Sequence, residues 1–449
     1  MNVATLAAVM RERARLSSHD GWTREEILAY QARKLAELRS FAAARSPFYA
    51  DLHRGLEDAP LESLPTVTKA AIMDRFDDVV TDRAVRFADV ERYLDAATAT
   101  GRFADRYRVA ATGGTTGRRG VFLADAHEWI TVLASYSRAY AWAGLSPGLT
   151  DRPRMAVVSS LNPTHQSSIV GATVASRFMP TLRLDAITPM ADIVSALNEF
   201  RPDALVGYAS ILRDLAQEQA AGRLRVEPRA VMSASEVLTD DARATILGAF
   251  GVMATNVYAA TETAGIASEC RSGHLHRYED LVIAEIVDED NQPVADGAMG
   301  AKLLVTVLFS RTQPLIRYEM SDRVAASVGQ PPSDLPYETL DRIEGREEDV
   351  LTLAGVVVRP NVFHAALERL QVAGWQIIEE PDGLRLLLAG AAGVDTASAA
   401  ESLIRALAAV GVSDVPVSVE LVDSIPRTLL GKAPLIRRAQ LAKPVAQVH

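Results

Sequence analysis

The spacing of hydrophobic positions first predicts helices. Apolar residues recur at roughly helical intervals across residues 27–41, directly after a capping-box signature, TREE, at residues 23–26. This pattern predicts helices through the first sixty residues. Similar spacing predicts helices over residues 70–79 and 126–142, and the second of these carries four aromatic side chains: Trp129, Tyr136, Tyr140 and Trp142.

Between residues 154 and 258, short apolar runs alternate with helical stretches, which is typical of βαβ units and a largely parallel sheet. Four runs are expected to form strands: residues 155–159, 203–207, 230–232 and 252–257. Three helices are expected among them: residues 190–200, 210–221 and 240–250. Ligands of such sheets bind beyond the carboxyl ends of the strands. The loops to consider are residues 160–165, 207–210, 233–236 and 258–262.

After residue 265 strand-like runs dominate, which predicts a β-rich subdomain with the form of a distorted barrel. A charged break, GREED at residues 345–349, then precedes a compact mixture of strands and helices that is long enough for a small domain. The predicted fold class is α/β. A large N-terminal domain over residues 1–345 has a parallel α/β sheet core, and a small α/β domain covers residues 346–449.

Composition narrows the class of protein. A 449-residue chain with 48% hydrophobic and 23% charged residues is globular, and its net charge of −10 argues against a nucleic-acid partner. No apolar run is long enough to span a bilayer, and the first residues lack the basic start of a signal peptide. The single cysteine, Cys270, excludes an internal disulfide framework. We expect a cytoplasmic protein with no membrane partner.

Residues 109–120, VAATGGTTGRRG, have the composition of a loop that binds an anion. Glycines leave backbone N–H groups free to face a phosphate, and the hydroxyls of Thr112, Thr115 and Thr116 add neutral donors. Arg118 and Arg119 add positive charge. The stretch is not a Walker loop, because it lacks a lysine and Ser/Thr after the last glycine. Taken alone, it is equally consistent with a flexible turn.

Five motifs in order give the loop a context: TGGTTGRR (112–119), YAATE (258–262), RYEMSD (317–322), GREED (345–349) and PRTLLGK (426–432). Together they resemble the core motifs of the adenylate-forming superfamily. The middle of the chain, with RPDALVGYASIL at residues 201–212 and SASEVLTDDAR at residues 233–243, is most similar to the phenylacetate–CoA ligase-like branch. The resemblance extends from about residue 64 to residue 432.

The resemblance implies a reaction in two steps that uses ATP, Mg²⁺ and coenzyme A. A carboxylate attacks the α-phosphorus of ATP, pyrophosphate leaves, and an acyl-adenylate forms. A thiol, usually coenzyme A, then displaces AMP. It also implies a mobile C-terminal domain that rotates about Glu348, where the family usually has aspartate.

The resemblance also implies how ATP is held. The phosphate loop holds the β- and γ-phosphates with Thr112, Gly113, Gly114, Thr115, Thr116 and Gly117. Tyr258 stacks on adenine, with Ser235 and Glu236 at its edge. Asp322 accepts from the ribose hydroxyls, and Arg346 approaches the ribose or a phosphate.

The catalytic groups implied by the resemblance are Thr261, Glu262, Lys432 and His165. Thr261 contacts the α-phosphate, and Glu262 holds Mg²⁺. Lys432 reaches the α-phosphate and the attacking carboxylate. His165 lies where many relatives place a residue beside the acyl carboxylate, although a loop histidine that caps the next helix is an equally good interpretation.

The chain departs from the branch in two places. Relatives often carry a Cys…His…Cys-x-Cys zinc cluster, and Cys270 and His276 match its first half. Residues 327–333 contain no cysteine, and a closed zinc site needs four ligands, so we expect no zinc. The lysine–proline pair that commonly ends the phosphate loop is replaced by Arg118 and Arg119.

The expected acid pocket combines small and aromatic residues, which favours a flat aromatic acid over a long acyl chain: Tyr136, Tyr208, Ser210, Ala234 and Gly265. The predicted function is AMP-forming ligation of an aromatic acid to coenzyme A. The alternatives are the same adenylation with a carrier protein or an amine as acceptor, and nitrite activation that diazotises an aromatic amine. A catalytically silent nucleotide-binding protein is a third hypothesis. A homodimer is also left open.

Overall fold

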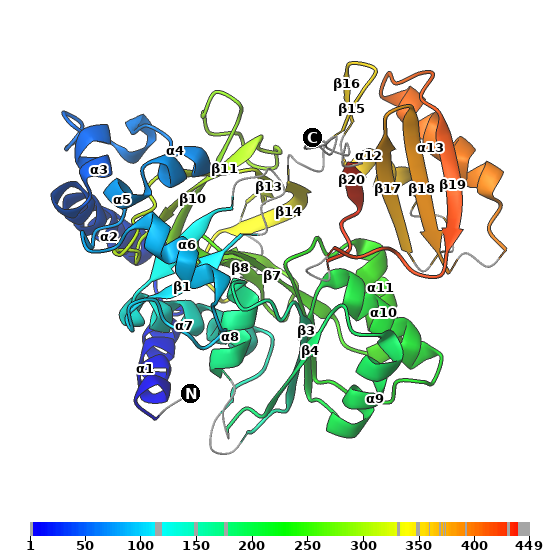
Figure 1. Cartoon of the computed structure of the whole chain (residues 1–449), viewed down its shortest axis with the longest axis horizontal. Coiled ribbons are helices and arrows are strands. Elements are labelled where there is room, and N and C mark those ends of the chain that lie inside the picture. Colours follow the sequence, from blue (N-terminus) through cyan, green and yellow to red (C-terminus); the bar gives the residue numbers. More distant parts are fainter. Residues whose placement is uncertain are drawn as a thin grey trace, which may run out of the picture. The chain divides into compact units, whose positions relative to one another are not determined.

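The computed structural model describes residues 3–112, 119–147, 151–174, 178–329, 333–346, 351–358, 360–367, 370, 372, 374–390, 393–428 and 432–438. The chain forms two compact units, Met1–Ile343 and Glu344–His449 (Figure 1). Each unit has its own hydrophobic core. Among the described residues, no helix is long and apolar enough to cross a membrane.

Unit 1 begins with helices α1 (Val3–His19), α2 (Arg24–Arg45) and α3 (Pro47–Leu52), followed after a short 3₁₀ turn (Leu61–Ser63) by α4 (Lys69–Asp74), α5 (Phe76–Val79) and α6 (Phe87–Asp95). The predicted capping box is confirmed, because Thr23 and Glu26 exchange side-chain and backbone hydrogen bonds at the start of α2. The single helix predicted over residues 70–79 is wrong. The chain breaks at Arg75, and the break lets both short helices turn their apolar residues into one core.

The centre of unit 1 is the predicted parallel sheet. Strands β3 (Met155–Ser159), β4 (Thr181–Asp185), β5 (Ala204–Gly207), β6 (Ala230–Ala234) and β7 (Ala254–Ala260) pair in parallel in the order β7-β6-β5-β3-β4. They are connected by α8 (Gln166–Val174), α9 (Met190–Phe200), α10 (Ala209–Ala220) and α11 (Asp240–Phe250). The α/β fold class is therefore confirmed, including its parallel core.

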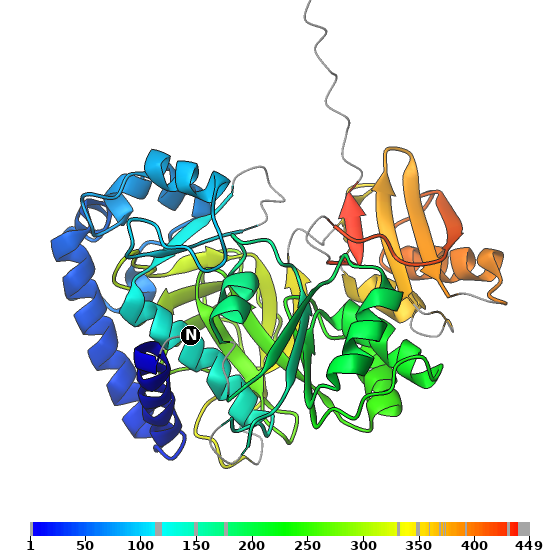
Figure 2. The same ribbon diagram turned by 60° about the horizontal axis from the view of Figure 1, so that its bottom comes forward.

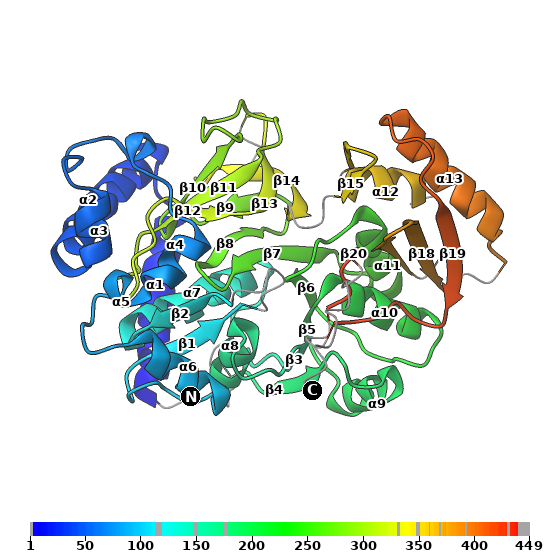
Figure 3. The ribbon, with the colours of Figure 1, turned by 45° about the horizontal axis from the view of Figure 1, so that its top comes forward.

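The β-rich region continues this sheet. Strands β8 (Ala264–Glu269), β9 (Leu275–Arg277) and β14 (Thr339–Arg346) follow β7 in antiparallel pairs, and β13 (Asp322–Ala326) forms the edge, which gives nine strands (Figure 3). Strands β10 (Val282–Val287), β11 (Lys302–Val307) and β12 (Tyr318–Met320) form a separate three-stranded sheet. The expected barrel is thus corrected to a shared sheet with a smaller antiparallel sheet in the same unit.

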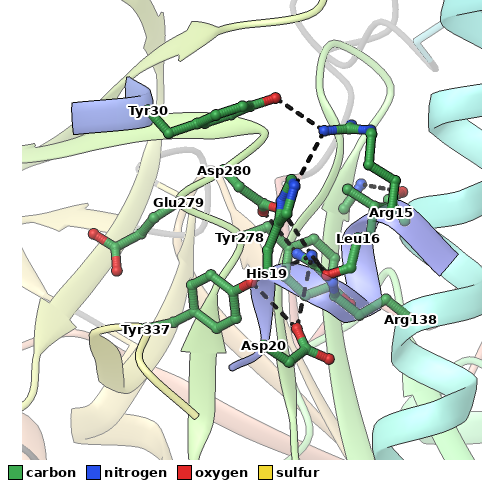
Figure 4. A network of polar contacts seen from close by, with 12 residues as sticks. Arg15, Leu16, His19, Asp20, Tyr30, Arg138, Tyr278, Glu279, Asp280 and Tyr337 are labelled. Atoms are coloured by element: carbon green, nitrogen blue, oxygen red, sulfur yellow. Dashed lines mark hydrogen bonds and ion pairs between the residues drawn. The ribbon is translucent and has the colours of Figure 1, made fainter. Parts of the chain in front are cut away.

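Helix α7 (Ala126–Trp142) has the predicted bounds and lies alongside α1 (Figure 2). A buried ionic network fastens the two helices to the β-rich region (Figure 4). Arg138 on α7 forms a bidentate pair with Asp280, with both N–O distances 2.7 Å, and donates to the carbonyl of Leu16. His19 Nδ1 lies 2.7 Å from the same carboxylate. Burial opposes ionisation of Asp280, but Arg138 and His19 outweigh it and hold the pKa of Asp280 well below its usual range.

Unit 2 is a four-stranded sheet with helices on one face. Its elements are β15 (Leu351–Leu353), β16 (Val356–Val358), α12 (Pro360–Leu367), β17 (Gly374–Glu380), β18 (Gly383–Ala389), α13 (Thr396–Ala409), β19 (Val417–Val422) and β20 (Ile436–Arg438). The order is β19-β18-β17-β20, and β15 and β16 form a separate hairpin. The helices pack on the sheet through Phe363, Leu367, Leu403 and Leu407.

Candidate active site

The phosphate loop joins two strands that the sequence did not predict. β1 (Arg108–Ala111) pairs antiparallel with β2 (Val121–Ala124), so residues 109–111 are strand and not loop, as their burial requires. Thr112 donates its N–H to the carbonyl of Gly120, and its Oγ1 accepts from the N–H of Gly120, both at 2.9 Å. Thr112 therefore closes the base of the loop. Gly113, Gly114, Thr115, Thr116, Gly117 and Arg118 lie outside the described residues.

The loop after β3 is fastened to the same base. Thr164 accepts at its carbonyl from the N–H of Ala111, at 2.8 Å, and its hydroxyl oxygen accepts from the guanidinium of Arg119. Arg119 is thus held by Thr164, in addition to adding positive charge near the phosphate loop. The next residue, His165, accepts at its carbonyl from the N–H of Ile169 in α8, 3.0 Å away. The role of its imidazole stays a prediction.

Residues 64–69 connect the RYEMSD motif with the base of the phosphate loop. Val67 exchanges backbone hydrogen bonds of 2.9 Å with Arg317 and Glu319 in the RYEMSD motif. At the other end, a Cβ built on Gly120 would lie 3.2 Å from Lys69 Cδ and 2.9 Å from the ring of Phe122. Gly120 is therefore required by close packing at the base of the phosphate loop.

Thr261 and Glu262 occupy the tight turn between β7 and β8, and both line a cavity of about 40 Å³. The walls come from β1, β2, α7, α8 and the segment after β11, and they include the aromatic rings of Phe122, Trp129 and Phe309. Ala264, directly after the turn, has a positive φ of 62°, which the tight reversal of the chain requires. The reactive pair expected from the sequence thus faces a mostly apolar space.

The cavity also contains charged residues that the sequence analysis missed. Glu128 on α7 is 3% exposed and accepts from the N–H groups of Asp125 and Thr312, both at 2.7 Å, and from the hydroxyl of Thr312. Burial, with the nearby charge of Asp125, raises the pKa of Glu128. Asp125 and Glu128 form a second capping box, and their spacing in the sequence could have identified Glu128.

Arg108 is the second missed residue. It lines the cavity from the start of β1 and donates to the carbonyl of Gly101 at 2.6 Å. Burial lowers its pKa, although a guanidinium stays charged at neutral pH. Arg108 and Glu128 are therefore residues of opposite charge in the wall that also includes Thr261 and Glu262.

The YAATE and RYEMSD motifs meet at this turn. The hydroxyl of Tyr318, on β12, lies 3.4 Å from Glu262 Oε1, a long hydrogen bond. Tyr258 on β7 and Asp322 at the start of β13 are each 8% exposed. Arg317 in the same motif is buried and bonds to Glu285 and to the carbonyl of Leu64, so its role is structural.

The predicted adenine-edge residues, Ser235 and Glu236, follow the carboxyl end of β6, beside the residues that follow β5 and β3. Glu236 accepts from the N–H of Ser210 at 2.9 Å, which places its carboxylate at the N-terminus of α10. Ser235 has a positive φ of 68°. The hydroxyl of Tyr208 accepts from the N–H of Ser160 at 2.9 Å, and burial raises the pKa of Tyr208 to about 12. These residues lie together as the parallel topology requires.

None of the five predicted pocket residues lines the cavity itself. Tyr136 accepts at its hydroxyl from the amide of Gln166, a wall residue, at 3.2 Å. A Cβ on Gly265 would lie 2.6 Å from the ring of Tyr278, which makes Gly265 a packing glycine. Ala234 is half-buried at the end of β6. Of the helix aromatics, Trp129 lines the cavity, whereas Trp142 packs edge-on against Tyr278 in the core.

Unit 2 carries the remaining predicted residues. The carbonyl of Lys432 accepts from the N–H of Thr428 at 2.7 Å, which closes a turn in the PRTLLGK motif. Glu348 and the side chain of Arg346 lie outside what the structure describes.

In the described part of the chain, no group of three or more His, Cys, Asp or Glu side chains is placed to hold a metal ion. His276 lies 3.1 Å from the carbonyl of Tyr337 through Nδ1 and 3.1 Å from Ser333 Oγ through Nε2, so Ser333 occupies part of the space around it. A magnesium ion that arrives with ATP needs only one or two protein carboxylates. Glu262 meets that requirement.

Comparison with known proteins gives consistent relatives, although no family model matches. The chain is 26% identical over 385 residues to phenylacetate–coenzyme A ligase of Thermus thermophilus, with 80% of each chain covered. It is 28% identical over 278 residues to the enzyme of the same name from Escherichia coli, covering 58% and 59%. A solved 2-hydroxyisobutyryl-CoA ligase in its postadenylation state shares the fold, with a TM-score of 0.74, 19% identity, and 94% and 91% coverage. An anthranilate CoA ligase with anthranoyl-AMP gives a TM-score of 0.53, 16% identity, and 72% and 66% coverage.

Proposed function

The chain belongs to the adenylate-forming superfamily, in its phenylacetate–CoA ligase-like branch, and we propose that it activates an aromatic carboxylic acid as an acyl-adenylate and transfers it to coenzyme A. It is an AMP-forming ligase that acts through adenylation followed by thioester formation. The aromatic nature of the acid is the proposed part.

One observation carries the proposal: the Thr261–Glu262 turn faces a cavity whose wall residues include three aromatic ones and Arg108, together with the buried Glu128. The rings of Phe122, Trp129 and Phe309 suit a flat apolar acid, and Arg108 suits its carboxylate. Relatives named for phenylacetate and anthranilate support the same class. The cavity, about 40 Å³, is smaller than the roughly 150 Å³ that accommodates benzene in an engineered protein cavity, so the walls must open to admit a ring.

The first step brings two anions together, so it needs positive charge and orientation more than a protein nucleophile. In the proposed arrangement the phosphate loop holds the leaving pyrophosphate, and Thr112 keeps its base closed. Thr261 donates to the α-phosphate, and Glu262 supplies a carboxylate oxygen to Mg²⁺. Lys432 offsets the charge that develops between the acid and the α-phosphate.

The other predicted residues orient the nucleotide and the acid. Tyr258 stacks on adenine beside Ser235 and Glu236, and Asp322 accepts from the ribose hydroxyls. His165 lies beside the acyl carboxylate. We assign Lys432 to a small domain, residues 346–449, that rotates about Glu348 against residues 1–345, so that Lys432 acts in adenylation and is withdrawn for thiol transfer. A protein with one cysteine in 449 residues suits the cytoplasm.

A pyrophosphate-exchange screen tests the proposal. Substituted benzoates, phenylacetates and cinnamates are expected to drive ATP–pyrophosphate exchange with kcat/KM at least about tenfold above small aliphatic acids such as 2-hydroxyisobutyrate. Mass spectrometry should then find the acyl-CoA, with amines offered as competing acceptors, nitrite offered in place of the acid, and Glu262→Gln as the inactive control. Equal exchange with aliphatic acids would contradict the aromatic assignment. A product with an amine and none with coenzyme A would contradict the acceptor.

A further inference from the structure

The loop that carries Lys432 crosses the face of the unit 2 sheet that α12 and α13 leave open. It connects β19 to β20, which are the two edges of the sheet, so it must pass over β18 and β17. Its residues Ile425 and Ala433 pack on Leu387 and Ala389 of β18, with Ile378 alongside. Ile377 instead belongs to the core beneath the helices. Because side chains alternate along a strand, Gln376 points to the same face as Ile378 and so lies under the loop.

Gln376 holds both arms of this loop with one amide group. Its Nε2 donates to the carbonyl of Pro434 at 2.7 Å and to the carbonyl of Pro426 at 3.4 Å. Both partners are carbonyl oxygens, which only accept, so the NH₂ end of the amide must face them. Between the two prolines, Thr428 and Lys432 close the turn. The bond to Pro434 lies two residues from Lys432.

The buried amide group of Gln376 is polar, so favourable packing alone does not account for its position. It is fully inaccessible to solvent, and its Oε1 has no hydrogen-bond partner among the residues that the structure describes. A buried amide with an unused acceptor costs stability relative to an apolar side chain of the same size. The two donated bonds are the compensating interaction. One bond reaches the first residue of the PRTLLGK motif and the other reaches a residue two positions beyond its last, which links that interaction to Lys432.

We propose that Gln376 is a positioning residue for adenylation, which fixes the direction of Lys432 by joining the two arms of its loop. The inference rests on the proposed role of Lys432. Gln376 does not touch substrate and acts only through the loop. Since Lys432 is assigned to adenylation alone, loss of the two bonds should affect that step and leave thiol transfer intact.

The test is Gln376→Met, which keeps the length and apolar packing of the side chain but removes both donors. We expect kcat for ATP–pyrophosphate exchange to fall about five- to tenfold, as for the loss of a buried hydrogen bond, while KM for ATP and for the acid stays within about twofold. Thioester formation from added phenylacetyl-adenylate and coenzyme A should be unchanged. Leu387→Met is the matched control, because it changes the same sheet face and contributes no hydrogen bond.

The outcomes separate this inference from the proposed function. If Lys432→Ala leaves exchange unchanged, the role of Lys432 fails and the inference fails with it. If Lys432→Ala lowers exchange but Gln376→Met does not, only the inference is overturned. An equal fall of both half-reactions in Gln376→Met would also overturn it, because Gln376 would then merely stabilise the unit. In the Lys432→Ala background, adding Gln376→Met should have no further effect on exchange.

Discussion

The phosphate loop of unit 1 and the Lys432 loop of unit 2 are fastened in different ways. At the phosphate loop, Thr112 and Gly120 share two hydrogen bonds, and Arg119 adds a third by contacting Thr164. At the Lys432 loop, one fully buried amide, Gln376, donates to both arms. The first fastening is shared among several groups, of which Thr112 is half-buried and Arg119 exposed, and the second is concentrated in one fully buried side chain.

The difference predicts how each loop responds to a substitution. Water can replace a lost hydrogen bond at a half-exposed position, and the remaining bonds still hold the loop. A buried donor has no such replacement. The phosphate loop should therefore tolerate single changes at its base, whereas the Lys432 loop should depend on Gln376. The changes in kcat and KM for both loops are compared with those caused by removing the side chain of Lys432.

Lys432→Ala should give the largest effect. Removing a positive group that acts in the transition state costs about 10²- to 10³-fold in kcat, by comparison with oxyanion-hole deletions. We expect this loss in ATP–pyrophosphate exchange, with thioester formation from added acyl-adenylate retained. Lys432→Arg, which keeps the charge but not its shape, should recover part of the activity. Equal loss of both half-reactions would show that Lys432 does not act in adenylation alone.

Thr112→Val should give a smaller effect. The substitution keeps the size of the side chain but removes the acceptor for the N–H of Gly120, while the backbone bond and the Arg119–Thr164 contact remain. We expect KM for ATP to rise about tenfold or less, the equivalent of roughly 0.5–1.5 kcal/mol, with kcat nearly unchanged. Thr112→Ser retains the hydroxyl and is the control. A loss in kcat as severe as that of Lys432→Ala would contradict distributed fastening.

Helices and parallel strands followed closely from the sequence, because local signals mark them. The bounds of α7, α9 and α11 agree with the predicted ranges, and Asp125 and Thr239 cap the starts of α7 and α11. Strand β4 was missed because its five residues are all half-exposed and lack a buried face. Strand β8 was missed for the opposite reason, since all six residues are buried and show no alternation.

The site was predictable where chemistry lies in one motif and unpredictable where it depends on contacts between motifs. The Thr261–Glu262 pair, whose catalytic role stays a prediction, was proposed from its motif and lies beside the cavity. The contact of Arg119 with Thr164 joins residues 45 positions apart, and Gln376 lies 50 positions from Pro426. Neither spacing carries a periodic signal. Contacts between residues so far apart in the sequence depend on the fold of the whole unit, so only the structure shows them.

Asp280→Asn should have the smallest effect on the two half-reactions, although it removes the bidentate partner of the buried Arg138 in unit 1. The change removes the bidentate partner of the buried guanidinium of Arg138 and leaves Asp20, 3.8 Å away, as its remaining carboxylate, so it costs up to about 3–5 kcal/mol of folding free energy. The folded pKa of Asp280 lies below its ordinary value of 3.8, so the stability it contributes is fully present above that pH and is lost as pH falls through the folded pKa. Urea unfolding should therefore show that the difference in unfolding free energy between the wild type and Asp280→Asn narrows as pH falls from about 4 toward 2. The exposed Asp58→Asn variant should follow the wild type.

At neutral pH, in the fraction that stays folded, Asp280→Asn should keep the wild-type ratio of pyrophosphate exchange to thioester formation. A change in that ratio would mean that this network, like Gln376, positions a reacting group.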